Sequence, residues 1–113
     1  MGSELKGRVA IVSGGSKGIG KAIAKSLANE GVNVVICARG VEALETVQKE
    51  IQQSGGNAVI ASADATDPDA VRDVIATAIE RFGGLDILVN NVGGVNRFAG
   101  FLELTDDEGL EAF

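Results

Sequence analysis

The chain of 113 residues carries ten basic and sixteen acidic side chains, a formal net charge of −6, and 45% of its residues are hydrophobic. This length allows one domain, residues 1–113, and the apolar content excludes a disordered chain. The sequence has no His and one Cys. It therefore excludes His/Cys metal clusters, Ser-His or Cys-His catalytic pairs and a disulfide framework, and favours a reducing, cytoplasmic setting.

Charge is divided unevenly along the chain. Residues 1–49 hold seven basic and four acidic side chains, whereas residues 50–113 hold three and twelve. An anionic ligand is therefore expected to bind the first half. The basic residues are dispersed and have no aromatic neighbours, so we expect no nucleic-acid binding. The longest apolar run is too short for a membrane span and no targeting segment is visible, so no membrane association is expected.

In the first half, short β-branched runs alternate with amphipathic segments. Residues 8–13 (RVAIVS) and 33–38 (NVVICA) predict strands that are buried on both faces. Between them, apolar residues recur every three or four positions from Ile19, which predicts a helix that ends near Gly31. A second helix is predicted around residues 44–51, and a third strand over residues 58–62.

The second half begins with the clearest helix signal. Asp67 and Pro68 are typical of an N-cap and a first helical residue, and a regular apolar stripe follows them as far as Phe82. Residues 85–90 (LDILVN) predict a fourth strand. Thr105 and Glu108 have the spacing of a capping box, so a further helix is predicted from there to the end of the sequence.

This alternation indicates an α/β fold, a Rossmann-type doubly wound parallel sheet that ends after the fourth strand and the start of the following helix. The segment between the first strand and the first helix is rich in glycine, with Gly14, Gly18 and Gly20 in it. Glycines there let the backbone approach a pyrophosphate, whose charge is attracted by the N–H groups at the helix start. The alternative is a tight turn that binds no ligand.

The glycine spacing resembles the T-G-x-x-x-G-x-G signature of the short-chain dehydrogenase/reductase family, with Ser13 in place of Thr. Asp64-Ala65 after the third strand resembles the family's adenine-contacting Asp, and Asn90-Asn91-Val92-Gly93 resembles its N-N-A-G motif. The resemblance extends over essentially the whole chain, which is similar to the 3-oxoacyl-carrier-protein reductases. It implies a cofactor site that comprises Gly14, Ser16, Lys17, Gly18, Ile19 and Gly20 at the phosphates, Asp64 and Ala65 at the adenine, and Asn91 and Gly93 at the nicotinamide-side ribose.

The end of the second strand indicates which dinucleotide is bound. A carboxylate there usually accepts hydrogen bonds from the ribose of NAD, but this sequence has Arg39 and no acid before Glu42. A guanidinium can hold a 2′-phosphate, and Lys17 adds a second positive charge. We therefore expect NADP(H) rather than NAD(H). The alternative is that both are solvated surface charges.

The resemblance implies an oxidoreductase that transfers hydride between nicotinamide and a small carbonyl or alcohol substrate, and a homo-oligomer for a full-length member. The family's catalytic Tyr-x-x-x-Lys pair cannot be formed, because the sequence has no Tyr. No catalytic residue is assigned, and the chain is interpreted as the amino-terminal, cofactor-binding portion. One alternative is a non-catalytic half-domain that binds a nucleotide or docks on a partner. Another, an extended relative such as a nucleotide-sugar epimerase, is disfavoured by the glycine spacing.

Overall fold

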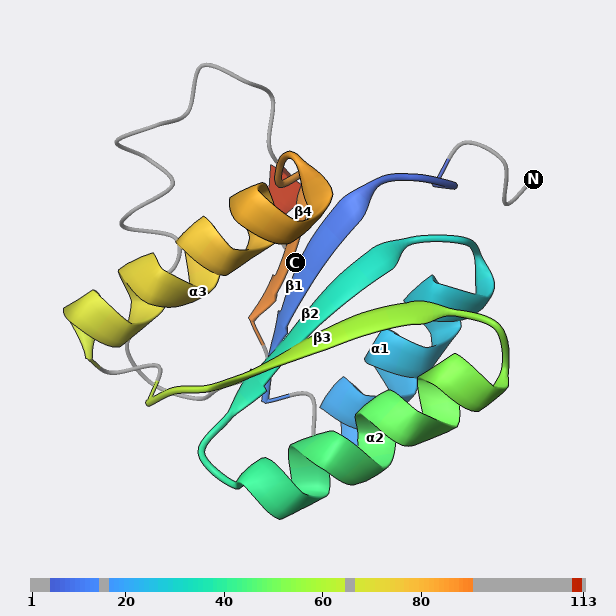
Figure 1. Ribbon diagram of the computed structural model, residues 1–113, viewed down its shortest axis with the longest axis horizontal. Coiled ribbons are helices and arrows are strands. Elements are labelled where there is room, and N and C mark those ends of the chain that lie inside the picture. Colours follow the sequence, from blue (N-terminus) through green and yellow to red (C-terminus); the bar gives the residue numbers. More distant parts are fainter. Residues whose placement is uncertain (1–4, 15–16, 65–66, 91–110, 113) are drawn as a thin grey trace.

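The computed structural model describes residues 5–14, 17–64, 67–90 and 111–112. In this part of the chain the elements alternate in the order β1 (Val9–Ser13), α1 (Gly18–Asn29), β2 (Asn33–Ala38), α2 (Val41–Gln53), β3 (Asn57–Ser62), α3 (Pro68–Phe82), β4 (Ile87–Asn90) and β5 (Glu111–Ala112). The strands form one sheet in the order β3-β2-β1-β4-β5 (Figure 1). Every pairing is parallel, which confirms the doubly wound sheet.

Helices cover both faces of the sheet, with α1 and α2 on one side and α3 on the other (Figure 1). Successive side chains of a strand point to opposite faces. On β1, Val12 accordingly packs into the core beneath α1 and α2, and Ile11 packs into the core beneath α3. All five residues of β1 are buried. This explains why the two central strands read as unbroken apolar runs rather than as alternating ones.

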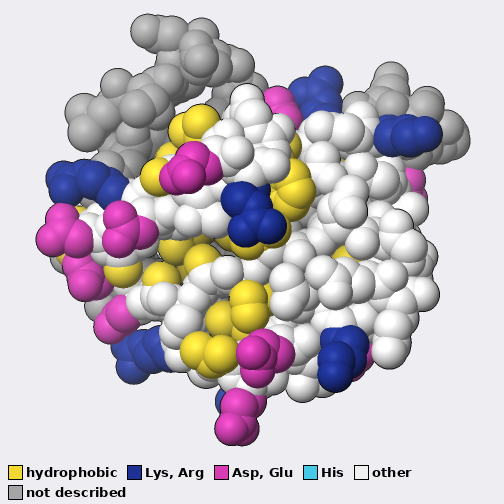
Figure 2. All heavy atoms as spheres, viewed as in Figure 1, with side chains coloured by type: hydrophobic (Ala, Val, Ile, Leu, Met, Phe, Trp, Pro, Cys, Tyr) yellow, Lys and Arg dark blue, Asp and Glu magenta, His cyan; other side chains and the backbone are white. Residues whose placement is uncertain are grey.

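The helix α3 begins and ends as predicted. The side chain of Asp67 accepts a hydrogen bond from the Asp69 backbone N–H at 3.0 Å, and Pro68 is the first helical residue. Gly83 ends the helix with a φ of 85°, a left-handed conformation that glycine adopts without strain. Figure 2 shows acidic side chains gathered over the beginning of this helix, where negative charge interacts favourably with the helix dipole.

The far edge of the sheet differs from the prediction. We predicted a helix from Thr105 to the end, yet Glu111–Ala112 is a strand, and residues 105–110 lie outside the described part of the chain. This strand pairs with Ile87 and Leu88 of β4. The fourth strand is therefore paired on both sides at these two residues, and the sheet does not end at β4. The capping box itself, Thr105 to Glu108, lies outside the described residues, so the predicted start of that helix stays a prediction.

At the amino ends of β1 and β4, one carboxylate ties the two strands together. The Val9 N–H donates to Asp86 Oδ2 at 2.9 Å, and the Asp86 N–H donates to the Val9 carbonyl at 2.8 Å. Arg8 Nη1 lies 3.9 Å from Asp86 Oδ1. This end of the sheet is opposite the glycine segment. Within the described residues, no helix combines the length and the hydrophobicity that a bilayer-spanning segment requires.

Candidate functional site

A pocket lies where β1 and β2 end and the following helices begin. Its volume is about 690 Å³ and it is lined by Gly14, Lys17, Ala38, Arg39, Gly40, Val41, Glu42 and Ala43. That volume lies within the range of about 300–1,000 Å³ typical of small-molecule sites. In an open parallel sheet, ligands bind at the carboxyl ends of the strands, where the strand order reverses. The order β3-β2-β1-β4-β5 reverses beside β1, next to this pocket.

The glycine segment reaches the pocket in a conformation that only glycine adopts easily. Gly14 has a φ of 74° and Gly18 a φ of 53°. The Gly14 N–H donates to the Cys37 carbonyl at 2.8 Å, which attaches the start of the turn to the end of β2. A Cβ on Gly18 would meet no atom within 4 Å, so it is backbone conformation and not crowding that requires glycine there.

The amino end of α1 has a positive side chain and no acid. Lys17 is the N-cap residue and is exposed, and the first turn contains no Asp or Glu. In α3 the corresponding position holds Asp67, which caps its helix. A helix start of the α1 kind leaves backbone N–H groups and the positive end of the helix dipole available to an anion. The residues beside the pocket therefore fit a phosphate-bearing ligand.

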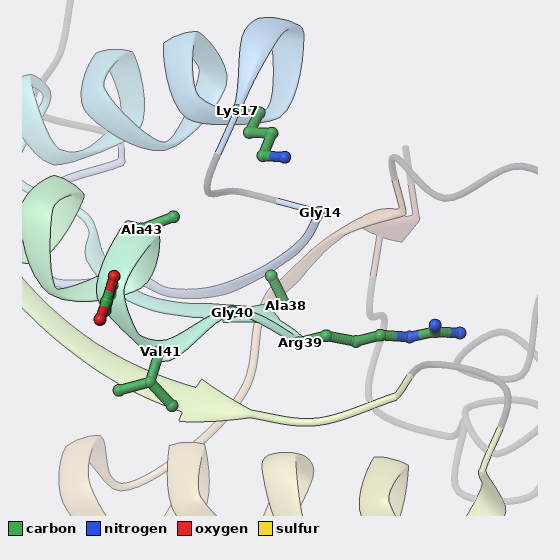
Figure 3. Close-up of a pocket in the computed structure, with 8 residues that line it drawn as sticks. Gly14, Lys17, Ala38, Arg39, Gly40, Val41 and Ala43 are labelled. Atoms are coloured by element: carbon green, nitrogen blue, oxygen red, sulfur yellow. The ribbon is translucent and has the colours of Figure 1, made fainter.

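Arg39 lines the pocket from the end of β2, the strand next to β1. Figure 3 shows its side chain extending away from Lys17 and Val41. Arg39 Nη2 lies 3.2 Å from Asp64 Oδ2, and the Arg39 side chain is 77% exposed. The predicted site residues Lys17 and Arg39 thus share a pocket, but their charged ends do not converge on one point in this conformation.

The single cysteine, Cys37, is buried in β2 next to the pocket residue Ala38, and its thiol is unreactive near neutral pH. Cys37 is 1% exposed and pairs in register with Ser13 of β1. Burial raises the pKa of the Cys37 thiol to about 11. It therefore stays protonated near neutral pH, which suits its interpretation as a small hydrophobic residue of the core.

The remaining predicted residues fall into two groups. In the first turn of α1, Ile19 is 71% exposed and Gly20 is buried. The others lie outside the described residues, namely Ser16, Ala65, Asn91 and Gly93. Their assignments to the cofactor remain predictions.

Sequence reasoning missed the wall that the start of α2 provides. Gly40, Val41, Glu42 and Ala43 line the pocket, and Val41 is 46% exposed. The signal for them was available: in a doubly wound sheet the helix after the second strand begins at the same edge as the glycine segment. The Arg39–Asp64 ion pair was also missed, because each residue was assigned separately to part of a ligand.

Comparison with known proteins identifies the family. A family model described as short chain dehydrogenase matches residues 8–113. The chain belongs to the short-chain dehydrogenase/reductase family. It is 42% identical over 106 residues to an uncharacterized oxidoreductase of Methylorubrum extorquens, covering 93% of this chain and 42% of that protein. Members of this family are oxidoreductases that use a nicotinamide dinucleotide, which agrees with the expected enzyme class.

Solved structures of short-chain dehydrogenases share the fold. L-Sorbose reductase from Gluconobacter frateurii, described as complexed with NADPH and L-sorbose, has a TM-score of 0.75 and 38% identity, over 79% of this chain and 34% of that one. A 7α-hydroxysteroid dehydrogenase, described as complexed with NADH, has a TM-score of 0.77 and 41% identity, over 80% of this chain and 35% of that one. The present chain thus spans about two fifths or less of these relatives, and they differ in cofactor.

Proposed function

We propose that this chain supplies the cofactor-binding portion of an NADP(H)-dependent oxidoreductase that transfers hydride between nicotinamide and a carbonyl or alcohol carbon. The observation that carries the proposal is the pocket that Lys17 and Arg39 line together, at the carboxyl ends of the two central strands. Family membership supports the reaction class. The two cationic side chains support the additional phosphate of NADP.

In this proposal the pyrophosphate lies against the start of α1. The left-handed conformations of Gly14 and Gly18 let the backbone approach the phosphates closely, and Lys17 contributes a positive charge. Ser16, Ile19 and Gly20 complete the phosphate-binding segment by resemblance to the family signature. Backbone N–H groups fixed in place bind the phosphates without reorganisation, which is the chief advantage of this arrangement.

The adenosine end of the cofactor is assigned to residues after β2 and β3. Arg39 offers a planar set of donors that matches the geometry of a 2′-phosphate. By resemblance Asp64 and Ala65 contact the adenine, and Asn91 and Gly93 contact the ribose next to nicotinamide. An NAD site usually has a carboxylate at the end of β2, and the first acid after that strand, Glu42, lies four residues beyond Ala38, in the first turn of α2.

The chemistry itself belongs to the cofactor, whose nicotinamide ring carries the hydride. The residues of this chain bind and orient it. A proton donor of the family's Tyr-x-x-x-Lys kind is not encoded in the 113 residues, which contain no Tyr. We therefore expect the chain by itself to bind NADPH without oxidising it when a carbonyl compound is present. That property also fits the second candidate, a non-catalytic nucleotide-binding half-domain.

The test is isothermal titration of the chain with NADPH and with NADH, repeated for Arg39→Ala. One charge-assisted hydrogen bond contributes about 1.5–3 kcal/mol, so losing the Arg39 contact should weaken NADPH binding roughly tenfold or more. NADH binding should change by less than about twofold. Arg72→Ala is the matched control, because Arg72 is also exposed and ion-paired but lies on α3.

Two results would contradict the proposal. Equal affinities for NADPH and NADH in the unmodified chain would remove the NADP assignment. A loss of NADPH affinity in Arg72→Ala as large as that in Arg39→Ala would attribute the effect to net charge rather than to this pocket.

A further inference from the structure

Two of the three residues assigned to the adenosine end of the cofactor, Arg39 and Asp64, form an ion pair with each other. Arg39 follows β2 directly and Asp64 follows β3 by two residues, and Ala38 and Ser62 are register partners at the ends of these strands. The guanidinium of Arg39 and the carboxylate of Asp64 approach to 3.2 Å. A carboxylate and a phosphate present similar pairs of oxygens to a guanidinium. Asp64 therefore pairs with a guanidinium nitrogen that could otherwise donate to a phosphate oxygen.

The backbone beneath this pair is anchored. The Ser62 hydroxyl donates to the Arg39 carbonyl at 3.0 Å, and the Ala63 N–H donates to the Ala38 carbonyl at 2.9 Å. Because both contacts fix the main chain at the end of β2, Arg39 can change its partner only by rotating its side chain. Its side chain is 77% exposed, so no core packing opposes that rotation.

We propose that Asp64 competes with the ribose 2′-phosphate for Arg39 and is thereby a specificity-determining residue that lowers the preference for NADP(H) over NAD(H). This inference rests on the proposed function, since it requires that Arg39 reads the 2′-phosphate. In the ion-paired conformation the Arg39 side chain extends away from Lys17 (Figure 3). To bind the 2′-phosphate of NADP(H), Arg39 must break its ion pair with Asp64. NAD(H) has no 2′-phosphate, so the ion pair can remain when it binds.

The size of the effect follows from the exposure of the pair. The side chains are 77% and 42% exposed, and solvent-exposed ion pairs are weak because water and salt screen them. Removing the competitor should therefore raise the ratio of NADPH affinity to NADH affinity by roughly two- to fivefold. A larger change would require a buried pair.

The experiment measures dissociation constants of NADPH and NADH for the unmodified chain, Asp64→Asn, Arg39→Ala and the double variant. Asn keeps the shape of Asp and removes its charge. Both nucleotides contain the same adenine, so any contact of residue 64 with the base cancels in the ratio. Asp69→Asn is the matched control, because Asp69 forms an exposed ion pair of 2.9 Å with Arg72 on α3. Circular dichroism of each variant verifies that it is folded.

We expect the ratio of NADPH affinity to NADH affinity to be two- to fivefold higher in Asp64→Asn than in the unmodified chain, and unchanged in Asp69→Asn. The double variant should have the same ratio as Arg39→Ala alone. An unchanged or lower ratio in Asp64→Asn overturns the inference while leaving the proposed function intact. A rise that persists in the Arg39→Ala background also overturns it, because Asp64 would then act on the phosphate directly. If Arg39→Ala itself leaves the ratio unchanged, both the NADP assignment and this inference fail.

Discussion

A substitution at Gly18 allows the effect of backbone strain on stability to be measured separately from the effect on NADPH binding. The Gly18 φ of 53° is left-handed, and a Cβ built there meets nothing within 4 Å. An Ala at this position therefore has room, but its backbone conformation costs about 1–2 kcal/mol. In Gly18→Ala the free energy of unfolding should fall by that amount, as measured by urea denaturation. The new methyl group would project from the first turn of α1, where we place the phosphates.

Gly83→Ala is the control for this variant. Gly83 has a φ of 85°, a Cβ added to it would also meet no atom within 4 Å, and it ends α3 far from the pocket. Both variants should lose similar stability. Only Gly18→Ala should weaken NADPH binding, by roughly tenfold or more if one phosphate contact is lost. Equal binding by both variants would refute the placement of the phosphates at α1, even if the stability losses agree.

Three further predictions concern the scaffold. Asp86→Ala should lower the free energy of unfolding in urea by about 1–3 kcal/mol, because it removes the acceptor for the Val9 N–H, whereas Asp86→Asn retains an acceptor and should cost less. The hydrogen bond from Lys25 lowers the pKa of the Glu50 carboxyl. The unmodified chain should therefore have a larger free energy of unfolding than Glu50→Gln at pH 7, and this difference should shrink as the pH falls below about 4.5 and the carboxylate is protonated. An advantage that grows towards pH 3 would contradict this sign. The Cys37 thiol, whose pKa burial raises to about 11, should react slowly with a disulfide reagent at pH 8 and rapidly once urea unfolds the chain.

Most of the fold was predictable because its signals are local. The central strands β1 and β2 are buried on both faces, so their apolar runs were unambiguous. Asp67 and Pro68 fixed the start of α3, and Gly83 fixed its end. The fourth strand begins at Ile87 rather than at residue 85, and the Asp86 side chain just before it accepts a hydrogen bond from the N–H of Val9, the first residue of β1. The strand at Glu111 was missed because it depends on pairing with β4, which no local pattern encodes.

Part of the pocket lining was predicted from the sequence, but the contacts within it were not. Gly14, Lys17 and Arg39 were expected at one place, and they line one pocket. The wall formed by the start of α2 and the bond between Arg39 and Asp64 were not expected. Both arise from the packing of neighbouring strand ends, which sequence spacing alone does not measure.

The most direct test of the cofactor site is a titration of the ¹⁵N-labelled chain with NADPH, followed by the backbone amide signals. If the dinucleotide binds at the carboxyl ends of β1 and β2, the amides of Gly14, Gly18 and Gly40 should shift strongly, while those of Val9 and Asp86 at the opposite end of the sheet should stay in place. Shifts centred on Val9 and Asp86, or no saturable shifts at millimolar NADPH, would contradict the assignment of this pocket as the cofactor site.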